Sequence, residues 1–319
     1  MTITTIAITD KEAWLKQRTQ DVTSTEVSTL YGLSPYSTEF ELFHQKRDKE
    51  VVRIDENERM TWGKRLEDAI ALGAAETMGW TVEKMDVYMR DEESRMGSSF
   101  DYKILHAPER EGEGILEIKN VDGIQYARKW LDDGEGKIEA PEHIELQIQH
   151  QMETADINWC CLVALVGGNT QKIIYRERNR EIGANIREKV AEFWKRVDHN
   201  APPKPDYVAD APYIIKTLRG EATHGLVAEA DNNVEELIKQ YAFVTNEASD
   251  LAKIKESYKA QILELIGDAS KVISTQGTIS CGMTKPSAGT LVTADMVGSY
   301  IGGRKGFRGF RFNAKKGAK

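Results

Sequence analysis

The chain has 319 residues, of which 40% are hydrophobic and 29% are charged, and its formal net charge at pH 7 is −8. This composition is typical of a soluble globular protein with one large domain or two ordinary ones. The sequence contains no apolar run near the ~20 residues that span a bilayer, and its first residues lack the pattern of a secretory signal peptide. We therefore expect a cytoplasmic protein with no membrane contact. The acidic balance excludes a uniformly basic surface, although a local groove can still be positive.

The three cysteines do not form a metal-binding pattern. Cys160 and Cys161 are adjacent within the apolar run "NWCCLVALVGG", and Cys281 stands alone. Zinc sites and iron–sulfur clusters need spaced ligands, which these positions do not supply. We expect Cys160 and Cys161 to be small core residues in a reducing compartment.

Apolar periodicity predicts a mixed α/β domain over residues 1–204. Residues 11–50 favour helices with a turn at "YGLSPY", and residues 58–80 favour one long amphipathic helix that ends at Gly79. Strand patterns then alternate with two more helices up to about residue 200. The expected strands lie within 81–91, 96–104, 114–120, 160–168 and 170–179, and the expected helices at 141–156 and 181–198.

A second module is predicted over residues 205–319, after the proline-rich stretch "DHNAPPKPDYVAD". Residues 225–267 have helical periodicity, either as one long helix or as a two-helix hairpin. Short strands are expected in "KVISTQGTISCGM". The chain then ends in a basic-aromatic tail that either contacts phosphates or packs its aromatic rings on the helical part. The tail residues are Arg304, Lys305, Phe307, Arg308, Phe310, Arg311, Phe312, Lys315 and Lys316.

The stretch "GILEIKN" (114–120) places an acid and a base on one face of an expected strand. Alternate side chains of a strand share a face, so Glu117 and Lys119 should lie side by side. Asp101 precedes them at an expected strand end. Two carboxylates and the carbonyl of Ile118 can hold a hard divalent cation, and the lysine can orient or deprotonate a water. The alternative is a surface salt bridge on a hairpin.

An acid followed by Glu-x-Lys is the signature of the PD-(D/E)xK nucleases, although Phe100 replaces the proline of that motif. Over residues 12–200 the segments "WLKQR", "TSTEV", "WGKRLE", "YMRDEESRMGSSFD", "LEIK" and "LQIQ" follow in order. In these segments the chain resembles the phage lambda exonuclease family, also called the YqaJ-like viral recombinase family. The resemblance implies a PD-(D/E)xK nuclease core, in which a mixed central sheet is flanked by helices.

The resemblance also implies roles for individual residues. Some have simpler alternatives: Glu67 could be a solvated helix residue, Asp91 could belong to a charged turn, and Arg18 could be solvated or pair along its helix. Gln147 and Gln149 lie two apart on a helix and cannot share one face, so one of them should be structural. The implied catalytic residues are Asp101, Glu117, Lys119 and Glu67; the implied metal ligands are Asp101, Glu117, Ile118, Glu67 and Asp91; and the implied pocket for a terminal 5′-phosphate comprises Arg18, Thr25, Ser99 and Gln147.

The activity implied by the resemblance is 5′-to-3′ digestion of one strand of double-stranded DNA, leaving 3′ overhangs for recombination. Mg²⁺ is the expected ion, with Mn²⁺ able to substitute. A homotrimer, a single-strand annealing partner and a phage or prophage origin in a bacterial cell are also implied. The alternatives are a Cas4- or RecB-like nuclease, a restriction-type nuclease on the same fold, and a module that binds DNA ends without cleavage.

Overall fold

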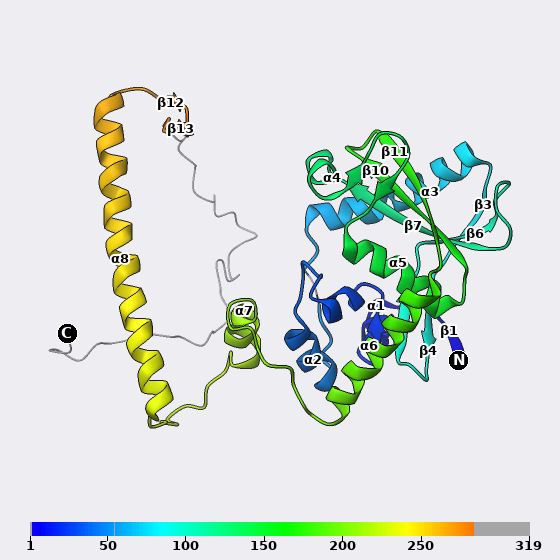
Figure 1. Cartoon of the computed structure of the whole chain (residues 1–319), viewed down its shortest axis with the longest axis horizontal. Coiled ribbons are helices and arrows are strands. Elements are labelled where there is room, and N and C mark those ends of the chain that lie inside the picture. Colours follow the sequence, from blue (N-terminus) through cyan, green and yellow to red (C-terminus); the bar gives the residue numbers. More distant parts are fainter. Residues whose placement is uncertain (1, 54, 284–319) are drawn as a thin grey trace, which may run out of the picture. The chain divides into compact units, whose positions relative to one another are not determined.

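The computed structural model describes residues 2–53 and 55–283. The chain divides into two units, Met1–Tyr213 and Ile214–Lys319 (Figure 1). The segment after residue 204 still belongs to the first unit, because the Asp210 carboxylate accepts a hydrogen bond from the hydroxyl of Thr38. The Tyr213 ring also lies 6.2 Å from that of His44. The predicted boundary therefore lies inside the first unit, and the two units are described separately.

The first unit contains two main sheets. In the larger one, β7 and β10 are parallel and the other neighbours are antiparallel. In the smaller one, β2 and β5 are parallel and the other neighbours are antiparallel. The larger sheet has the order β11 (Thr170–Glu177), β10 (Trp159–Val166), β7 (Gly114–Val121), β6 (Tyr102–His106) and β3 (Thr81–Lys84). The smaller has the order β1 (Ile3–Ala7), β4 (Val87–Asp91), β5 (Met96–Ser99) and β2 (Val22–Thr23).

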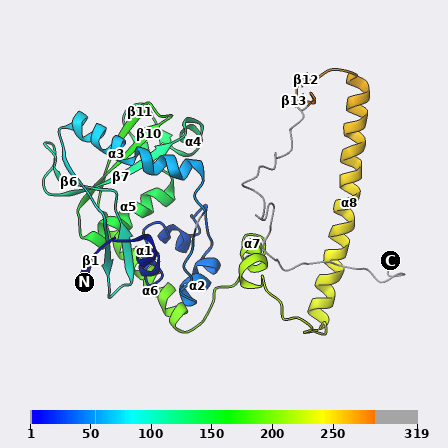
Figure 2. The same ribbon diagram turned by 180° about the vertical axis from the view of Figure 1, so that it is seen from behind.

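Helices cover both faces of the larger sheet. α3 (Glu58–Met78) packs on one face and α5 (Glu142–Ala155) on the other, as both views show (Figures 1 and 2). Cys161 and Val163 of β10 face α3, whereas Cys160 and Leu162 join the core with α5. A strand covered on both faces needs a continuous apolar run, which explains "CCLVALV". The mixed α/β prediction and the core assignment of Cys160 and Cys161 are confirmed.

The remaining elements of the first unit surround these two layers. η1 packs with α2, β5 and α6 in a third core cluster. Helix ends follow local signals: Gly79 has φ 70° after α3, and the Asp122 side chain caps α4. The bounds are α1 (Lys11–Arg18), η1 (Val27–Tyr31), α2 (Glu39–Arg47), α4 (Gly123–Lys129), β8 (Leu131–Asp132), β9 (Ile138–Glu139), α6 (Arg180–Asp198) and α7 (Ala211–Tyr213).

Two predicted strands are each divided between the two sheets. Residues 81–91 form β3 in the larger sheet and β4 in the smaller, and residues 96–104 form β5 in the smaller and β6 in the larger. The chain thus passes between the sheets twice, and the two passages are joined by a hydrogen bond from the backbone N–H of Met85 to the carbonyl of Asp101 at 3.1 Å. Asp101 therefore lies where the chain passes from one sheet to the other. Strand β1 and helix α4 are additional elements that the sequence pattern did not predict.

The second unit contains one long helix, α8 (Asn232–Ile266), which resolves the choice between one helix and a hairpin. The Asp231 side chain accepts a hydrogen bond from the N–H of Val234 and so caps its first turn. A hairpin of β12 (Lys271–Ser274) and β13 (Gly277–Ser280) follows, and η2 (Ile214–Leu218) precedes the helix. The predicted basic-aromatic tail lies outside the described residues. No helix in the described part of the chain is both long and apolar enough to cross a membrane.

Candidate active site

The edge of strand β7 holds the first acid of the site. Asp101 follows β5, and its Oδ2 accepts a hydrogen bond from the backbone N–H of Ile118 at 2.8 Å. Strand β6 begins at Tyr102, opposite Leu116, so β7 continues beyond the end of its neighbour. The carboxylate of Asp101 takes the place of that missing strand. Since the N–H and C=O of one strand residue point to the same edge, the Ile118 carbonyl lies on the Asp101 side.

Glu117 is the second acid, and its side chain is only 3% exposed. Its Oε1 contacts the ammonium of Lys119 and accepts a hydrogen bond from Nε2 of Gln147 at 2.6 Å. Its Oε2 accepts from Nε2 of Gln151 at 2.8 Å. Gln147 and Gln151 lie one turn apart on α5, so one helix face holds both oxygens of the carboxylate. Glu117 is therefore buried and fixed, and its pair with the partly buried Lys119 is not a salt bridge on the surface.

Negative charge accumulates around this pair. Burial first, and then the nearby carboxylate of Glu117, raises the pKa of Asp101 well above its usual range. Burial also raises the pKa of Glu67, with the carboxylate of Glu117 adding to it. Burial alone would lower the pKa of Lys119, but the carboxylates of Glu117 and Asp101 outweigh it, so that this pKa is raised. Glu67 of α3 therefore lies within electrostatic reach of both acids, while Lys84 lies 3.5 Å from its carboxylate.

The donor set suits a hard cation that keeps part of its water shell. Within residues 2–53 and 55–283, no three histidine, cysteine, aspartate or glutamate side chains converge on one point where an ion could bind. Asp101 and Glu117 would hold the ion together with the Ile118 carbonyl and water. These are all oxygen donors, and Mg²⁺ is commonly bound through one or two carboxylates plus water. The residues present therefore fit the expected ion.

Asp91 is not brought to this group. It lies at the end of the β4–β5 hairpin where it pairs with Met96, whereas Ser99 is at the opposite end. Three residues along a strand separate the two ends by about 10 Å. Asp91 is fully buried and accepts a 2.6 Å hydrogen bond from Nη1 of Arg187. Its contacts favour a structural ion pair.

Three of the predicted phosphate-pocket residues lie together beside α1. Nη2 of Arg18 donates to the hydroxyls of Thr25 at 3.1 Å and Thr23 at 3.3 Å. Its guanidinium lies 4.8 Å from the centre of the Trp14 ring, and the Trp14 indole N–H donates to the hydroxyl of Ser99 at 2.9 Å. A planar cation surrounded by hydroxyls is a suitable environment for a phosphate.

Gln151 connects this pocket to the two acids. Its Nε2 donates to the carbonyl of Ser99 at 3.1 Å as well as to Glu117. Gln147 contacts Glu117 directly, so the structure places it beside the acids rather than beside Arg18. Gln149 is turned away: its amide donates to the carbonyl of Glu177 and accepts from the N–H of Asn179.

Sequence reasoning missed Gln151, Trp14, Thr23 and Lys46. Gln151 could have been found from the i, i+4 spacing that puts it on the face of Gln147. Lys46 is buried, and its ammonium donates to the carbonyl of Arg18 at 2.8 Å and lies 2.7 Å from Oε2 of Glu26. No sequence signal marks it, because the contact joins two helices that are far apart along the chain.

Residues 13–158 match the family model described as the YqaJ-like viral recombinase domain. The named residues around Glu117 and Arg18 all lie within this segment. The resemblance to this family that the sequence motifs indicated is therefore confirmed.

A Bacillus subtilis (strain 168) protein described as uncharacterized protein YqaJ is 25% identical over 266 residues, which cover 81% of this chain and 79% of that protein. The first unit is about two thirds of the chain, so this match extends into the second unit.

Among solved structures, the alkaline exonuclease LHK-Exo from Laribacter hongkongensis matches at 17% identity and a TM-score of 0.47, over 64% of this chain and 99% of its own. A phage related exonuclease from Haemophilus somnus 129PT matches at 15% identity and a TM-score of 0.40, over 56% of this chain and 94% of its own.

Proposed function

We propose that the first unit is a Mg²⁺-dependent exodeoxyribonuclease that digests one strand of duplex DNA from its 5′ end. The observation that carries the proposal is the placement of Asp101, which is hydrogen-bonded to the strand that bears Glu117 and Lys119. Two acids, a strand carbonyl and a lysine on one strand edge are what metal-assisted phosphodiester hydrolysis requires. The match of residues 13–158 to the model of a viral recombinase domain supports DNA as the substrate.

Each residue has a defined task in this reaction. Asp101, Glu117 and the carbonyl of Ile118 would hold the ion, which, when bound, polarises the scissile phosphate and acidifies a coordinated water. The ammonium of Lys119 lies beside Glu117, where it can orient the attacking water and neutralise charge that develops on the phosphate. Gln147 and Gln151 keep both oxygens of Glu117 fixed, so that the carboxylate does not rotate during the reaction.

The pocket around Arg18 determines the direction of digestion in this proposal. A terminal phosphate carries more charge than an internal diester, and a guanidinium can bind two of its oxygens at once. The hydroxyls of Thr25 and Ser99 supply neutral donors. Because Ser99 is two residues from Asp101, a terminal phosphate bound there places the next diester beside the two acids. The products are mononucleotides and a 3′ overhang suited to a recombination partner.

The proposal includes two further features implied by the lambda exonuclease resemblance. A homotrimeric ring of first units would enclose the duplex, and a single-strand annealing protein would receive the overhang. Light scattering on the purified chain tests the first feature, since the mass should correspond to three protomers or to a multiple of three. Copurification with the annealing protein encoded nearest to this gene tests the second.

Digestion of duplexes labelled separately at their 5′ and 3′ ends tests the activity and its direction. We expect mononucleotides to be released from the 5′ end with Mg²⁺ or Mn²⁺ and not with EDTA. Release from the 3′ end would contradict the polarity. Internal cuts would favour a restriction-type nuclease, and intact DNA under every metal would favour an end-binding module. A Lys119→Gln variant that binds DNA without cutting controls for a contaminating nuclease.

A further inference from the structure

Helix α8 has an apolar stripe that follows a strict seven-residue repeat. The repeat runs through the whole helix, and nine of its ten inward positions are apolar, with a lysine at the tenth. A repeat of 3.5 residues is the pattern of a left-handed coiled coil rather than of a helix packed on a globular core. The first position of each repeat is Val234, Tyr241, Ala248, Lys255 or Ile262, and the fourth is Leu237, Val244, Leu251, Tyr258 or Leu265.

This stripe is exposed in the single chain. Leu237, Val244, Leu251 and Tyr258 are each between 61% and 63% exposed, and Leu265 is more exposed still. A 35-residue helix with such a face buries little apolar area on its own, and soluble proteins rarely leave a continuous stripe of this length uncovered.

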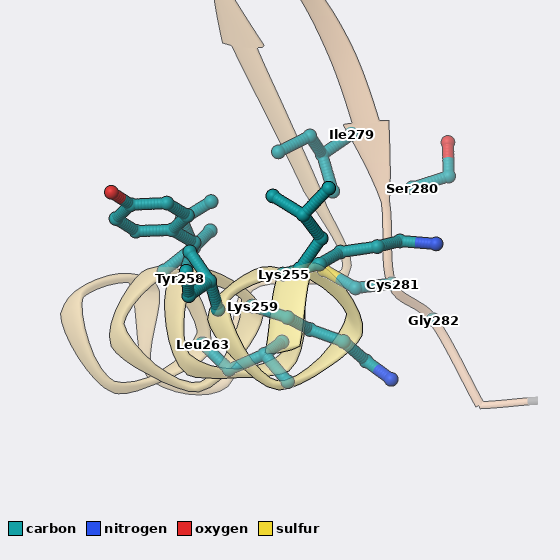
Figure 3. Close-up of a pocket in the computed structure, with 11 residues that line it drawn as sticks. Lys255, Tyr258, Lys259, Leu263, Ile279, Ser280, Cys281 and Gly282 are labelled. Atoms are coloured by element: carbon teal, nitrogen blue, oxygen red, sulfur yellow. The ribbon is translucent and has the colours of Figure 1, made fainter. Parts of the chain in front are cut away.

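Half of the stripe lines an open cleft. The C-terminal half of α8 and the end of strand β13 enclose a volume of about 780 Å³ (Figure 3). Leu251, Lys255, Tyr258 and Ile262 of the stripe contribute to its wall, and Ile279 and Cys281 contribute from the hairpin side. The N-terminal half of the stripe lines no part of this cleft. The helix therefore presents an apolar ridge at one end and a groove at the other.

We propose that α8 pairs with α8 of a second copy of this chain as an antiparallel two-stranded coiled coil. The ridge of each copy then occupies the groove of the other. This arrangement uses one surface twice, as a two-fold interface requires. It goes beyond the nuclease activity and does not depend on it.

The repeat is complementary to itself in this orientation over its full length. With the two helices centred on each other, every first-position residue meets a fourth-position residue of the second copy, and no inward position is left unpaired. The ten layers comprise five pairings that each occur twice by symmetry: Val234 with Leu265, Leu237 with Ile262, Tyr241 with Tyr258, Val244 with Lys255, and Ala248 with Leu251. Small residues meet larger ones in most layers, which favours even packing.

The position of Lys255 favours the antiparallel orientation. In a parallel pair, Lys255 would meet Lys255 of the second copy, and like charges would face each other in the interface. In the antiparallel pair, it meets Val244 of the second copy instead. Glu247 of the second copy then lies one turn from that layer, and its carboxylate can accept a hydrogen bond from the ammonium of Lys255.

Removing one inward side chain tests the interface in the full chain. Leu251→Asp should halve the mass measured by light scattering, because it places a charge in the central layers of both helices. Phe243→Asp is the matched control, since Phe243 is 65% exposed and Leu251 63%, but Phe243 lies off the stripe. Circular dichroism should show that both variants keep their helix. An unchanged mass for Leu251→Asp would overturn the proposal and indicate that another segment or another protein covers the stripe.

Disulfide trapping tests the orientation independently. It is done in a Cys281→Ser background, because Cys281 is more accessible than the buried Cys160 and Cys161. The double variant Tyr241→Cys with Tyr258→Cys should form covalent dimers under mild oxidation, because these positions meet across the pair. Neither single variant should do so. Dimers from either single variant would show a parallel pair and overturn the register, and absence of dimers from the double variant would overturn the pairing.

Discussion

The carboxylate of Asp101 accepts a 2.8 Å hydrogen bond from the backbone N–H of Ile118. This contact joins residues from two different β segments at the point where the chain changes sheets. It fixes one acid beside the strand that presents the other, so the site does not depend on a flexible loop for its geometry. Asp101 therefore keeps its position as long as strand β7 keeps its own.

Asp101→Asn should therefore abolish cleavage without unfolding the domain. The amide oxygen can still accept the N–H of Ile118, but the charge that binds the cation is gone. The loss of turnover should exceed the roughly 10²-fold expected for a supporting residue. Titration calorimetry with Mn²⁺ should show no binding. Glu113→Gln is the control, since Glu113 is an exposed carboxylate paired with Lys103 on the same sheet, and near-normal turnover in Asp101→Asn would place the site elsewhere.

Gln151→Leu should lower metal affinity or turnover by about 10–100-fold, because Gln151 holds Oε2 of Glu117 from outside the ligand set. Gln149→Leu is the matched control on the same helix. It leaves the N–H of Asn179 and the carbonyl of Glu177 without their partner, at a cost of about 1–3 kcal/mol in unfolding free energy. Its metal affinity should be normal. If both variants lost stability and kept metal affinity, Gln151 would be structural.

Asp91 and Arg187 should contribute to stability rather than to metal binding. Burial would raise the pKa of Asp91, but the hydrogen bond and charge of Arg187, together with hydrogen bonds from Ser94 and the backbone of Glu93, outweigh burial, so this pKa is lowered on folding. A lowered pKa means that the pair stabilises the fold fully above the unfolded value of about 3.9, and that the contribution is lost as pH falls through the folded value. Arg187→Gln should cost about 3 kcal/mol at pH 7.

Urea unfolding between pH 7 and pH 4 measures this effect. The difference in unfolding free energy between wild type and Arg187→Gln should be constant down to about pH 4, so the scan is continued to about pH 2, where the difference should narrow. Arg196→Gln is the control, because its pair with Glu39 is more exposed than the Asp91 pair and should be worth less than about 1 kcal/mol. Loss of Mn²⁺ binding in a folded Asp91→Asn variant would restore Asp91 to the metal site.

The sequence predicted those parts of the site whose geometry is local. The period of a strand fixes Glu117 beside Lys119 whatever the rest of the fold does, and a glycine at a left-handed position fixes the end of α3 at Gly79. The contact of Asp101 with Ile118 was not predictable, since it depends on β6 beginning at Tyr102, opposite Leu116, so that β7 continues past the end of its neighbour. The division of residues 81–91 between two sheets was not predictable either, because the sequence pattern of a strand does not show which strand it pairs with.

The polar contacts of α5 show the same limit. Helical spacing established that Gln147 and Gln149 cannot share a face, but not which face meets the sheet. The burial of Gln147 and Gln151 against Glu117 settles that choice through contacts 30 and 34 residues apart. Arg18 and its hydroxyl partners were within reach of sequence reasoning, because Thr25 lies only seven residues away.

Arg18→Ala should slow digestion of 5′-phosphorylated duplexes far more than digestion of 5′-hydroxyl duplexes. Its guanidinium lies between the Trp14 ring and the hydroxyls of Thr23 and Thr25, so its direction is fixed before any phosphate arrives. Fixed donors lose little entropy on binding, and a charge-assisted contact of this kind is worth about 1.5–3 kcal/mol, or roughly 10–100-fold in rate. The wild type should itself prefer the phosphorylated end.

Single-turnover rates on matched duplexes that differ only in the 5′ group measure this preference. Arg18→Lys should recover only part of the loss, because an ammonium keeps the charge but not the planar fork. Lys16→Ala controls for general loss of positive charge on α1, since Lys16 is exposed on the same last turn. An equal loss on both substrates in Arg18→Ala would show that Arg18 contacts the DNA backbone in general. The terminal-phosphate pocket, and with it the physical basis proposed here for 5′-to-3′ digestion, would then have to be sought elsewhere.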